Sequence, residues 1–260
     1  MKLKRIQKIE EYILDNNTVT LDKLADVFNV SKNTIRRDIN ELVEKGTIKK
    51  VYGGVSVNSN PLVPFDKRQI KNIYSKSLIA EEAAKLIEDG DIIFVDSGTT
   101  TLNLADFLKD KKNITIITNN LNFINKCIKY NNLNIISTGG SLVRKTNSLV
   151  GTDTLNMIKK YNINKAFMAS TGISLASGVT NGSPQECEIK KLVVSKSNLV
   201  YVLIDHSKFG ISSLMTYCSM EDIDYLITDK KPPEEYIQFI KRNNVNLIIA
   251  QNDKCLYAQG

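Results

Sequence analysis

Cysteine and histidine are scarce in this 260-residue chain, and their positions exclude several classes of protein. The four cysteines, Cys127, Cys187, Cys218 and Cys255, lie too far apart for the paired spacing of a zinc site, and His206 is the single histidine. We therefore expect no metal centre and no disulfide framework, and we interpret the cysteines as small apolar core residues. No cofactor is predicted.

Long apolar stretches are also absent. The longest dense run is the six residues from Leu199 to Ile204, whereas a membrane span requires ~18. The N-terminal segment MKLKRIQKIEEYI starts with basic residues, as a signal peptide does, but the apolar stretch that should follow is missing. Hydrophobic residues make up 42% and charged residues 24%, which excludes a disordered chain. We expect a soluble, cytoplasmic protein with no membrane partner.

Positive charge is in excess and is denser near the N-terminus. The chain has 35 Lys and Arg against 28 Asp and Glu, and residues 1–57 hold 11 basic and 8 acidic side chains. Two basic clusters lie in this segment: Lys32, Arg36 and Arg37, and Lys45, Lys49 and Lys50. A basic patch of this kind indicates a polyanionic partner such as nucleic acid.

The composition divides the chain into two domains. Residues 56–66, SVNSNPLVPFD, contain two prolines, two asparagines and two serines, which interrupt regular structure. We therefore predict a small domain at residues 1–57, a linker at 58–69 and a larger domain at 70–260.

Apolar segments typical of strands alternate with amphipathic helices in the larger domain. Seven such segments lie at residues 91–97, 113–119, 133–138, 165–170, 198–204, 224–228 and 245–250. Strand and helix in repetition predict a mostly parallel sheet with helices on its faces. The fold class expected for the larger domain is therefore α/β.

The small domain has the pattern of three helices followed by a hairpin. Residues 2–16 are amphipathic, and Thr20 and Ser31 are placed to cap a second and a third helix. Two helices joined by a tight turn are the signature of a helix-turn-helix. Beyond Gly46 the alternating TIKKVYGGVSV, with the Gly53–Gly54 pair, predicts a two-stranded wing.

The third helix has a polar and basic outer face. Ile35 and Ile39 recur at helical spacing and must face the core, so at about 100° per residue Asn33 and Arg37 point outward. Arginine can pair with guanine and asparagine with adenine, while lysine, serine and threonine can hold phosphates. The predicted DNA contacts are Ser31, Lys32, Asn33, Thr34, Arg36, Arg37, Lys49 and Lys50. The alternative is an ordinary three-helix bundle whose basic residues are only solvated. The helix caps, the turn length, the spacing of the core residues and the basic face together favour a DNA-binding domain.

The segment VTLDKLADVFNVSKNTIRRDINELVEKGTIKKVYGGV resembles the N-terminal domain of the DeoR family of bacterial transcriptional regulators. In that family the SxxTIRRD stretch forms the recognition helix and a Gly-Gly pair follows in the wing, and the likeness spans nearly all of residues 1–57. The resemblance implies a winged helix-turn-helix. The chain departs from it at residues 49–52, Lys-Lys-Val-Tyr, where many members have Arg and His before the glycines, and this departure alters the expected wing contacts with the DNA backbone.

Polar and glycine-rich segments follow the predicted strands of the larger domain, where open parallel sheets collect their ligands. The predicted ligand-binding residues are Asp96, Ser97, Gly98, Thr99, Thr100, Asn119, Gly139, Gly140, Asp205 and Lys208. Hydroxyl groups and backbone N–H groups at a helix start suit an anion, and phosphate is the obvious one. Lys208 supplies a counter-charge, and Asp96, Asn119 and Asp205 can bind hydroxyls. Each loop alone is explained by turn formation, but the set predicts one site for a small polyhydroxylated anion.

The motifs DSGTT, TNN, GG, VG at 150–151 and DHSKFG stand in the order of the DeoR-type sensor domain, which is related in fold to ribose-5-phosphate isomerase and glucosamine-6-phosphate deaminase. This resemblance covers residues 70–250 and implies that residues 97–100 bind phosphate with help from Lys208. Asn164 replaces an Asp common in the family, and its place at a strand start indicates a structural role. RIQKIEEYIL, PLVPFDKR and KYNINKAFMAS are similar to the myo-inositol catabolism repressor branch, which implies a phosphorylated effector from inositol degradation.

Two functions fit these residues. The first is a DNA-binding repressor, a homodimer or homotetramer, that a phosphorylated sugar-like metabolite releases from its operator; an activator of opposite sign fits equally well. The second is a sugar-phosphate isomerase or deaminase with an accessory DNA-binding domain. Isomerisation needs a general base and an acid partner, and residues 169–180 lack the clustered acids that the related isomerases have there, so we predict that the chain is not an enzyme. A ligand role for Glu186 and Glu188 stays open, and His206 is interpreted as a hydrogen-bonding loop residue.

Overall fold

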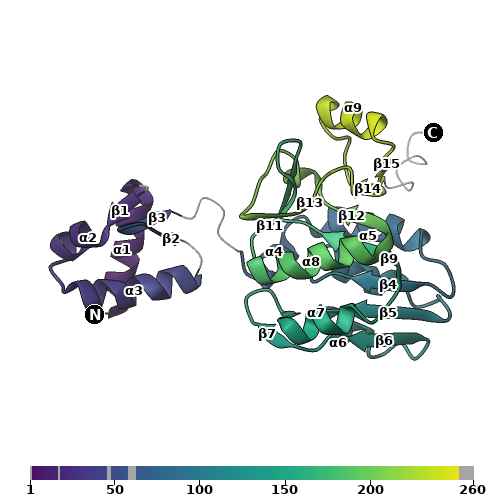
Figure 1. Cartoon of the computed structure of the whole chain (residues 1–260), viewed down its shortest axis with the longest axis horizontal. Helices are drawn as coiled ribbons and strands as arrows, with labels where there is room; N and C mark the ends of the chain where they lie inside the picture. Colours follow the sequence, from purple (N-terminus) through teal and green to yellow (C-terminus); the bar gives the residue numbers. More distant parts are fainter. Residues whose placement is uncertain (1, 17, 46–47, 58–62, 252–260) are drawn as a thin grey trace, which may run out of the picture. The chain divides into compact units, whose positions relative to one another are not determined.

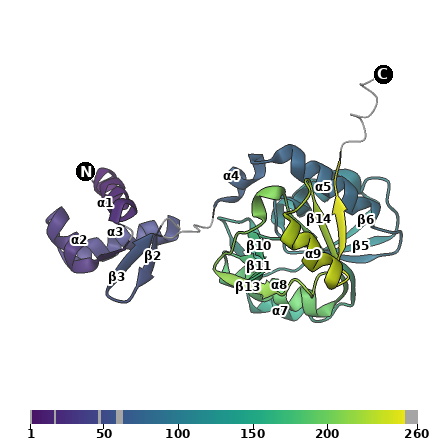
Figure 2. The ribbon, with the colours of Figure 1, turned by 90° about the horizontal axis from the view of Figure 1, so that it is seen from above.

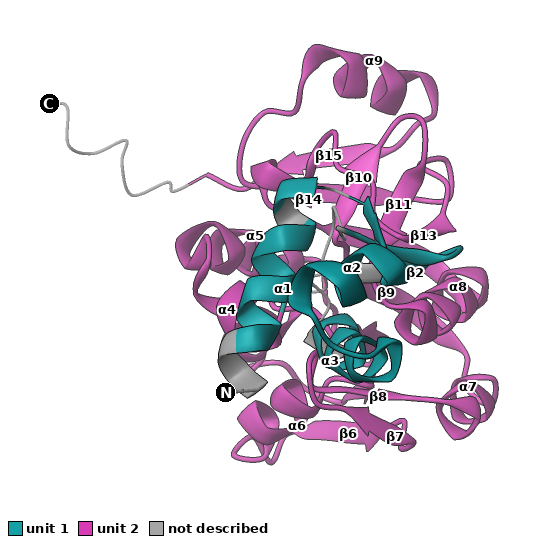
Figure 3. Ribbon diagram, turned by 90° about the vertical axis from the view of Figure 1, so that its left-hand side faces the viewer, with its two compact units in different colours: residues 1–63 teal, residues 64–260 magenta. Residues whose placement is uncertain are grey.

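The computed structural model describes residues 2–16, 18–45, 48–57 and 63–251. The chain divides into two compact units, residues 1–63 and 64–260 (Figure 3). This division lies inside the predicted linker. Residues 58–62 are outside the described residues, whereas α4, Phe65–Ile70, occupies the second half of the predicted linker and belongs to the larger unit.

The smaller unit is a winged helix-turn-helix, as predicted. Its elements are α1 Lys2–Asn16, β1 Thr18–Thr20, α2 Leu21–Phe28, α3 Lys32–Lys45, β2 Ile48–Val51 and β3 Gly54–Val57. The strands form an antiparallel sheet in the order β1-β3-β2, in which β1 was not predicted. The Thr20 hydroxyl accepts the Lys23 N–H at 3.2 Å, and the Ser31 hydroxyl accepts the Thr34 N–H at 3.2 Å. Both predicted caps are therefore present.

A continuous apolar core fixes the angle between α3 and the wing. It contains the buried side chains Ile6, Ile9, Ile13, Val19, Leu24, Ile35, Ile39, Leu42, Ile48 and Val55. Asp38, 1% exposed on α3, accepts the Arg5 Nε–H of α1 at 2.7 Å. Strand β1 passes so close to the wing that a Cβ at Gly54 would lie 2.3 Å from the carbonyl oxygen of Val19, so only glycine fits there.

The larger unit is built on a seven-stranded parallel sheet in the order β15-β14-β12-β9-β4-β5-β6. Its strands are β4 Ile92–Val95, β5 Ile114–Thr118, β6 Leu133–Ser137, β9 Ile163–Ala169, β12 Ser197–Leu203, β14 Tyr225–Thr228 and β15 Asn246–Ile249. All seven predicted strands are in this sheet. The order runs outward in both directions from the β4–β9 pair, so the topological switch point, where such sheets bind ligands, lies between these two strands.

Helices cover both faces of this sheet (Figures 1 and 2). One face packs against α5 Ile73–Lys85, η1 Thr101–Phe107 and α6 Leu121–Cys127. The other packs against α7 Thr152–Ile158, α8 Pro184–Lys196 and α9 Glu234–Arg242. Among the described residues no helix is both long and apolar enough to cross a bilayer.

Short elements gather at the carboxyl edge of the sheet, together with α4 (Figure 1). They are the hairpin β7 Ser141–Val143 and β8 Ser148–Val150, the 3₁₀ turn η2 His206–Lys208, and an antiparallel sheet of β10 Gly172–Ser174, β11 Gly178–Asn181 and β13 Met215–Cys218. The two small sheets were not predicted, because their strands are short and their partners lie far away in the sequence.

Candidate functional site

The outer face of α3 presents most of the predicted DNA contacts to solvent. Ser31, Lys32, Asn33, Arg36, Arg37 and Lys50 are exposed and Thr34 is half-buried, while the side chain of Lys49 lies outside the described residues. Arg36 donates to Asn33 Oδ1 at 3.3 Å, and Lys32 forms an ion pair with Asp22 at 2.5 Å. Ser31 and Thr34 also bond to each other through their hydroxyls at 2.9 Å, so both contribute to the start of α3.

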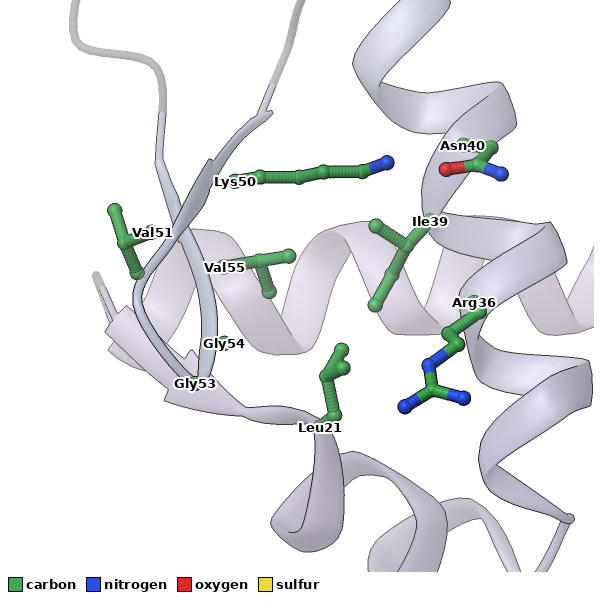
Figure 4. Close-up of a pocket in the computed structure, with 9 residues that line it drawn as sticks. All are labelled: Leu21, Arg36, Ile39, Asn40, Lys50, Val51, Gly53, Gly54 and Val55. Carbon is green, nitrogen blue, oxygen red and sulfur yellow. The ribbon is translucent and has the colours of Figure 1, made fainter.

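A hollow of about 280 Å³ separates α3 from the wing (Figure 4). Arg36 and Asn40 line it from α3, and Lys50 lines it from β2 with its amine directed at Asn40 (Figure 4). Asn40 was missed in the sequence, although its spacing of four residues from Arg36 places the two on one face of the helix. Tyr52, at the tip of the wing, is fully exposed. Two cations from different elements border this hollow, an arrangement that suits a phosphate backbone.

The end of β4 forms the centre of the candidate ligand site. Asp96, Ser97, Thr99 and Thr100 are all buried, and a Cβ on Gly98 would lie 2.1 Å from the Cβ of Ala169, at the end of β9. The Gly98 N–H donates to the Thr101 hydroxyl at 3.1 Å. Thr101 begins η1, a seven-residue 3₁₀ helix. The predicted cradle of helix-terminal amides therefore lacks the N–H of Gly98, which is already used within the chain.

Two acceptor oxygens beside this turn have no partner. Asp96 Oδ2 accepts the Ala169 N–H at 3.0 Å and the ammonium group of Lys190. Asn119 Nδ2 donates to the Leu149 carbonyl at 3.3 Å and to Ser97 Oγ at 3.4 Å. Among the described residues four buried side-chain oxygens lack a hydrogen-bond partner, and Asp96 Oδ1 and Asn119 Oδ1 are two of them. A buried acceptor without a donor costs about 1–3 kcal/mol. A ligand whose hydroxyl groups donate to these two oxygens removes that cost.

The loop after β12 contributes the other charged residues predicted for the site. Asp205 accepts from the Ser207 hydroxyl at 2.5 Å, from the Ser207 N–H at 3.0 Å and from Asn72 Nδ2 at 2.9 Å. Burial alone raises the pKa of Asp205, but these donors and the charge of Lys208 bring it below its ordinary value. Burial lowers the pKa of Lys208, and Asp205 partly opposes this effect.

Three cations near the site were missed in the sequence. Lys190 of α8 pairs with Asp96. Lys76 of α5 donates to the carbonyl oxygens of Arg68 and Lys71, and burial lowers its pKa to about 8. Burial also lowers the pKa of Arg68, while Glu186 and Asp96 lie close enough to oppose this. The sequence does not distinguish these three residues from the solvent-exposed basic residues that helices ordinarily have.

Other predicted residues have structural partners. Gly139 and Gly140 follow β6, two strands from β4, and form a left-handed turn with φ of 64° and 102°. Glu186 accepts from the Ser148 hydroxyl at 2.7 Å and from Asn181 Nδ2 at 3.0 Å, so both of its oxygens have donors. Asn164 accepts the Ile92 N–H at 2.8 Å, in keeping with the structural role expected of it. His206 Nδ1 lies 2.7 Å from Asp229 Oδ2.

Comparison with known proteins assigns a family model to each unit. Residues 5–60 match the DeoR-like helix-turn-helix domain, and residues 71–230 match the DeoR C terminal sensor domain. The HTH-type transcriptional regulator IolR of Bacillus subtilis (strain 168) is 49% identical over 251 residues, which cover 96% of this chain and 100% of that protein. The glycerol-3-phosphate regulon repressor of Escherichia coli (strain K12) is 30% identical over 240 residues, covering 92% of this chain and 95% of that protein.

Among solved structures, the chain is similar to ribose 5-phosphate isomerase A of Methanocaldococcus jannaschii. The match has 18% identity and a TM-score of 0.40, and it covers 54% of this chain and 55% of that one. A likeness this weak says nothing about activity.

Proposed function

The chain belongs to the DeoR family of transcriptional regulators, and we propose that it represses a carbohydrate catabolic operon until a phosphorylated sugar-like metabolite releases it from its operator. It is a DNA-binding regulator rather than an enzyme, since both units match DeoR models and its relatives are named as regulators and repressors.

The DNA-reading role falls to α3 and the wing. Arg37 and Asn33 are the base-reading candidates, because they are exposed on the outer face of α3 and have the donor and acceptor patterns that read guanine and adenine. Arg36 and Lys50, on the two walls of the hollow, are assigned to the phosphate backbone. Ser31, Lys32 and Thr34 are assigned to phosphates as well, and for Lys32 this requires exchange of its ion pair with Asp22.

The effector role falls to the carboxyl edge of the parallel sheet. The observation that carries it is the pair of buried, unpartnered acceptors, Asp96 Oδ1 and Asn119 Oδ1, at the ends of β4 and β5. We assign the hydroxyl groups of the effector to these acceptors, and its phosphate to Lys208 and the hydroxyls of Ser97, Thr99 and Thr100. Phosphate needs a cation and hydrogen-bond donors, and this edge supplies both.

The narrower assignment, an effector from inositol degradation, rests on the 49% identity to IolR over nearly the whole chain. The name of the second relative, a glycerol-3-phosphate regulon repressor, supports control of a pathway of phosphorylated polyols in more general terms.

Binding to an operator with two half-sites requires at least a homodimer of the repressor, and a homotetramer is the other candidate. Two recognition helices in successive major grooves lie ~34 Å apart, one helical turn of DNA. An effector that binds more tightly to an arrangement unable to span this distance shifts the population away from DNA. Light scattering of the purified protein measures the oligomeric state, and a monomer at operator-binding concentrations would contradict this mechanism.

A panel of phosphates tests the effector. Ribose 5-phosphate, glucose 6-phosphate, glycerol 3-phosphate and an inositol monophosphate are compared with their unphosphorylated counterparts in thermal unfolding of the full chain. A ligand at 100 times its Kd adds about 2.7 kcal/mol of stability. We expect one phosphorylated compound to raise the Tm and its counterpart to leave it unchanged. Equal effects of the phosphorylated and unphosphorylated forms would contradict an anion site.

A further inference from the structure

Strand β15 forms one edge of the seven-stranded sheet, and α9 leads into it (Figure 1). Among the described residues β15 pairs with β14 alone. Its sequence, Asn-Leu-Ile-Ile, contains no proline and no charged residue, which are common means of preventing another strand from pairing at a sheet edge. The side chains of Leu247 and Ile248 are half-buried and pack on opposite faces of the sheet. The edge therefore has the properties of a strand that pairs on both sides.

The backbone of β15 is arranged to pair with a second copy of itself. The Asn246 N–H donates to the carbonyl oxygen of Asp224 at 2.8 Å, on the side of β14. Because alternate residues of a strand direct their backbone groups to opposite sides, Leu247 and Ile249 direct theirs away from β14. In an antiparallel pair of β15 strands with a two-fold axis at Ile248, Leu247 lies opposite Ile249 of the second copy. Both residues face outward, so they exchange both of their backbone hydrogen bonds.

Helix α9 has a charge pattern that fits the same arrangement. The two-fold axis is perpendicular to the sheet, so the α9 helices of the two copies lie on the same face and run antiparallel. Glu234, Gln238 and Lys241 recur at helical spacing and are exposed. Lys241 also lines a groove of about 430 Å³ between α9 and the start of β15, so this stripe lies on the side of the sheet edge. Antiparallel packing therefore brings Glu234 against Lys241 of the second copy.

The opposite edge of the sheet lacks this combination. Its strand β6 also has no charged residue. However, the helix beside it, α6, has a single charged residue, Lys126, which pairs with Asp106 of the same chain at 2.6 Å. A helix without an acidic and a basic end is not complementary to an antiparallel copy of itself. The charge pattern therefore favours β15 over β6.

We propose that two copies of the chain associate through β15 and α9, so that their seven-stranded sheets join into one continuous sheet. This inference rests on the homodimer of the proposed function and names the surface that forms it. A two-fold interface presents the same patch on both copies, so the patch must be complementary to itself. The outward backbone groups of β15 and the opposite charges at the two ends of α9 both meet this condition, and the charges fix the orientation.

The first test exchanges charges on α9 in the full chain. Glu234→Lys and Lys241→Glu each place like charges opposite one another in a homodimer. The double variant Glu234→Lys/Lys241→Glu places opposite charges there again, and so does a heterodimer formed by mixing the two single variants. Sedimentation velocity at low ionic strength, where exposed charges are least screened, measures the Kd of the dimer for each protein and for the mixture.

The second test blocks the strand edge. Leu247→Pro removes an N–H that faces away from β14, so it breaks no hydrogen bond between β15 and β14. Ile135→Pro is the matched control on the opposite edge. The Thr138 N–H donates to the carbonyl oxygen of Thr118 in β5, so by the same alternation Ile135 of β6 faces outward, and its side chain is also half-buried.

We expect each single charge variant to raise the Kd of the dimer at least about tenfold, because both ion pairs of the two-fold interface change from attraction to repulsion. The double variant and the mixture should return to the wild-type Kd. Leu247→Pro should halve the particle mass measured for the wild type, and Ile135→Pro should leave it unchanged. Thermal unfolding of each variant verifies that it is folded.

Three results would overturn this interface and leave the DNA-binding and effector functions standing. They are single charge variants with the wild-type Kd, failure of the double variant and the mixture to restore association, and a folded Leu247→Pro with the wild-type mass. The last result would mean that the β15 edge is covered from within the chain or that association uses another surface. A wild type that is monomeric at operator-binding concentrations would instead contradict the homodimer itself.

Discussion

Replacing Gly98 by alanine tests the geometry on which the candidate effector site depends. Gly98 is not among the glycines with a left-handed φ, so alanine can adopt its backbone conformation. The added Cβ, however, would lie 2.1 Å from the Cβ of Ala169, whereas carbon atoms in contact are ~3.5–4.0 Å apart. The ends of β4 and β9 must therefore separate at the switch point of the sheet, where the Asp96 N–H donates to the Phe167 carbonyl at 3.1 Å.

Overpacking of this kind costs about 1–3 kcal/mol. For a unit the size of residues 64–260, we expect the Tm to fall by about 2–12 °C, at roughly 2–4 °C per kcal/mol. Scanning calorimetry of the full chain measures this fall. DNA affinity without effector should be unchanged, because the substitution lies in the larger unit.

The matched control is the same substitution in an Ala169→Gly background. Without the Cβ of Ala169, the nearest atoms to the new methyl group are Thr101 Oγ1 at 3.0 Å and the residue 169 Cα at 3.6 Å. Gly98→Ala should therefore cost at least about 1 kcal/mol less in that background than in the wild type. An equal cost in both backgrounds, or a Tm within 1 °C (roughly 0.3–0.5 kcal/mol) of the wild type, would refute the steric argument.

Four further predictions concern the two recognition surfaces. Arg37→Ala should weaken operator binding by about 1–3 kcal/mol if Arg37 reads a base, and an unchanged gel-shift titration would remove it from the interface. Lys50→Ala should weaken binding to all sequences and reduce the slope of log K against log salt by about 1, so an identical slope would exclude a phosphate contact from β2. Lys208→Ala should keep DNA affinity and lose about 1.5–3 kcal/mol of effector affinity; normal release by the effector would remove Lys208 from the site. Burial lowers the pKa of Lys76 from 10.5 to about 8, so the folded chain binds fewer protons than the unfolded chain between these values, and its stability should rise with pH through that window relative to Lys76→Met. Parallel Tm curves of the two proteins from pH 7 to 9.5, a range that includes the lowered pKa of about 8, would contradict this.

The architecture was predictable because local patterns and the tertiary fold agree. The seven apolar segments, each followed by a polar loop, all became strands of one parallel sheet. Thr20 and Ser31 cap the helices that their positions predict. Where a side chain forms a hydrogen bond with the backbone a few residues away, both partners lie in one short segment. Such an interaction can therefore be predicted from the sequence.

The candidate site was only half predictable, because its charges come from segments far apart in the sequence. Arg68 lies in a stretch that the two prolines marked as a linker, and only its contacts with the larger unit make that stretch part of the site. Lys190 has the spacing of an ordinary basic residue on a helix, yet it lies buried against Asp96, 94 positions away. Conversely, Gly98 was assigned an anion-binding N–H that Thr101 already accepts. Sequence patterns show which strand ends are polar, but they do not show which of those polar groups the fold has already paired.

The central claim is that one chain couples an operator-binding surface to an effector site, and linkage gives the most direct test of it. The operator duplex is first selected from random DNA with the purified protein, and the effector is the panel compound that stabilises the chain. The effector Kd is then measured by calorimetry with the protein free and with the protein saturated by operator. Coupling free energies are typically 1–3 kcal/mol and must be reciprocal. We predict that operator weakens effector binding by the same factor, about 5- to 150-fold, by which effector weakens operator binding. An effector Kd that is the same with and without operator would contradict the account.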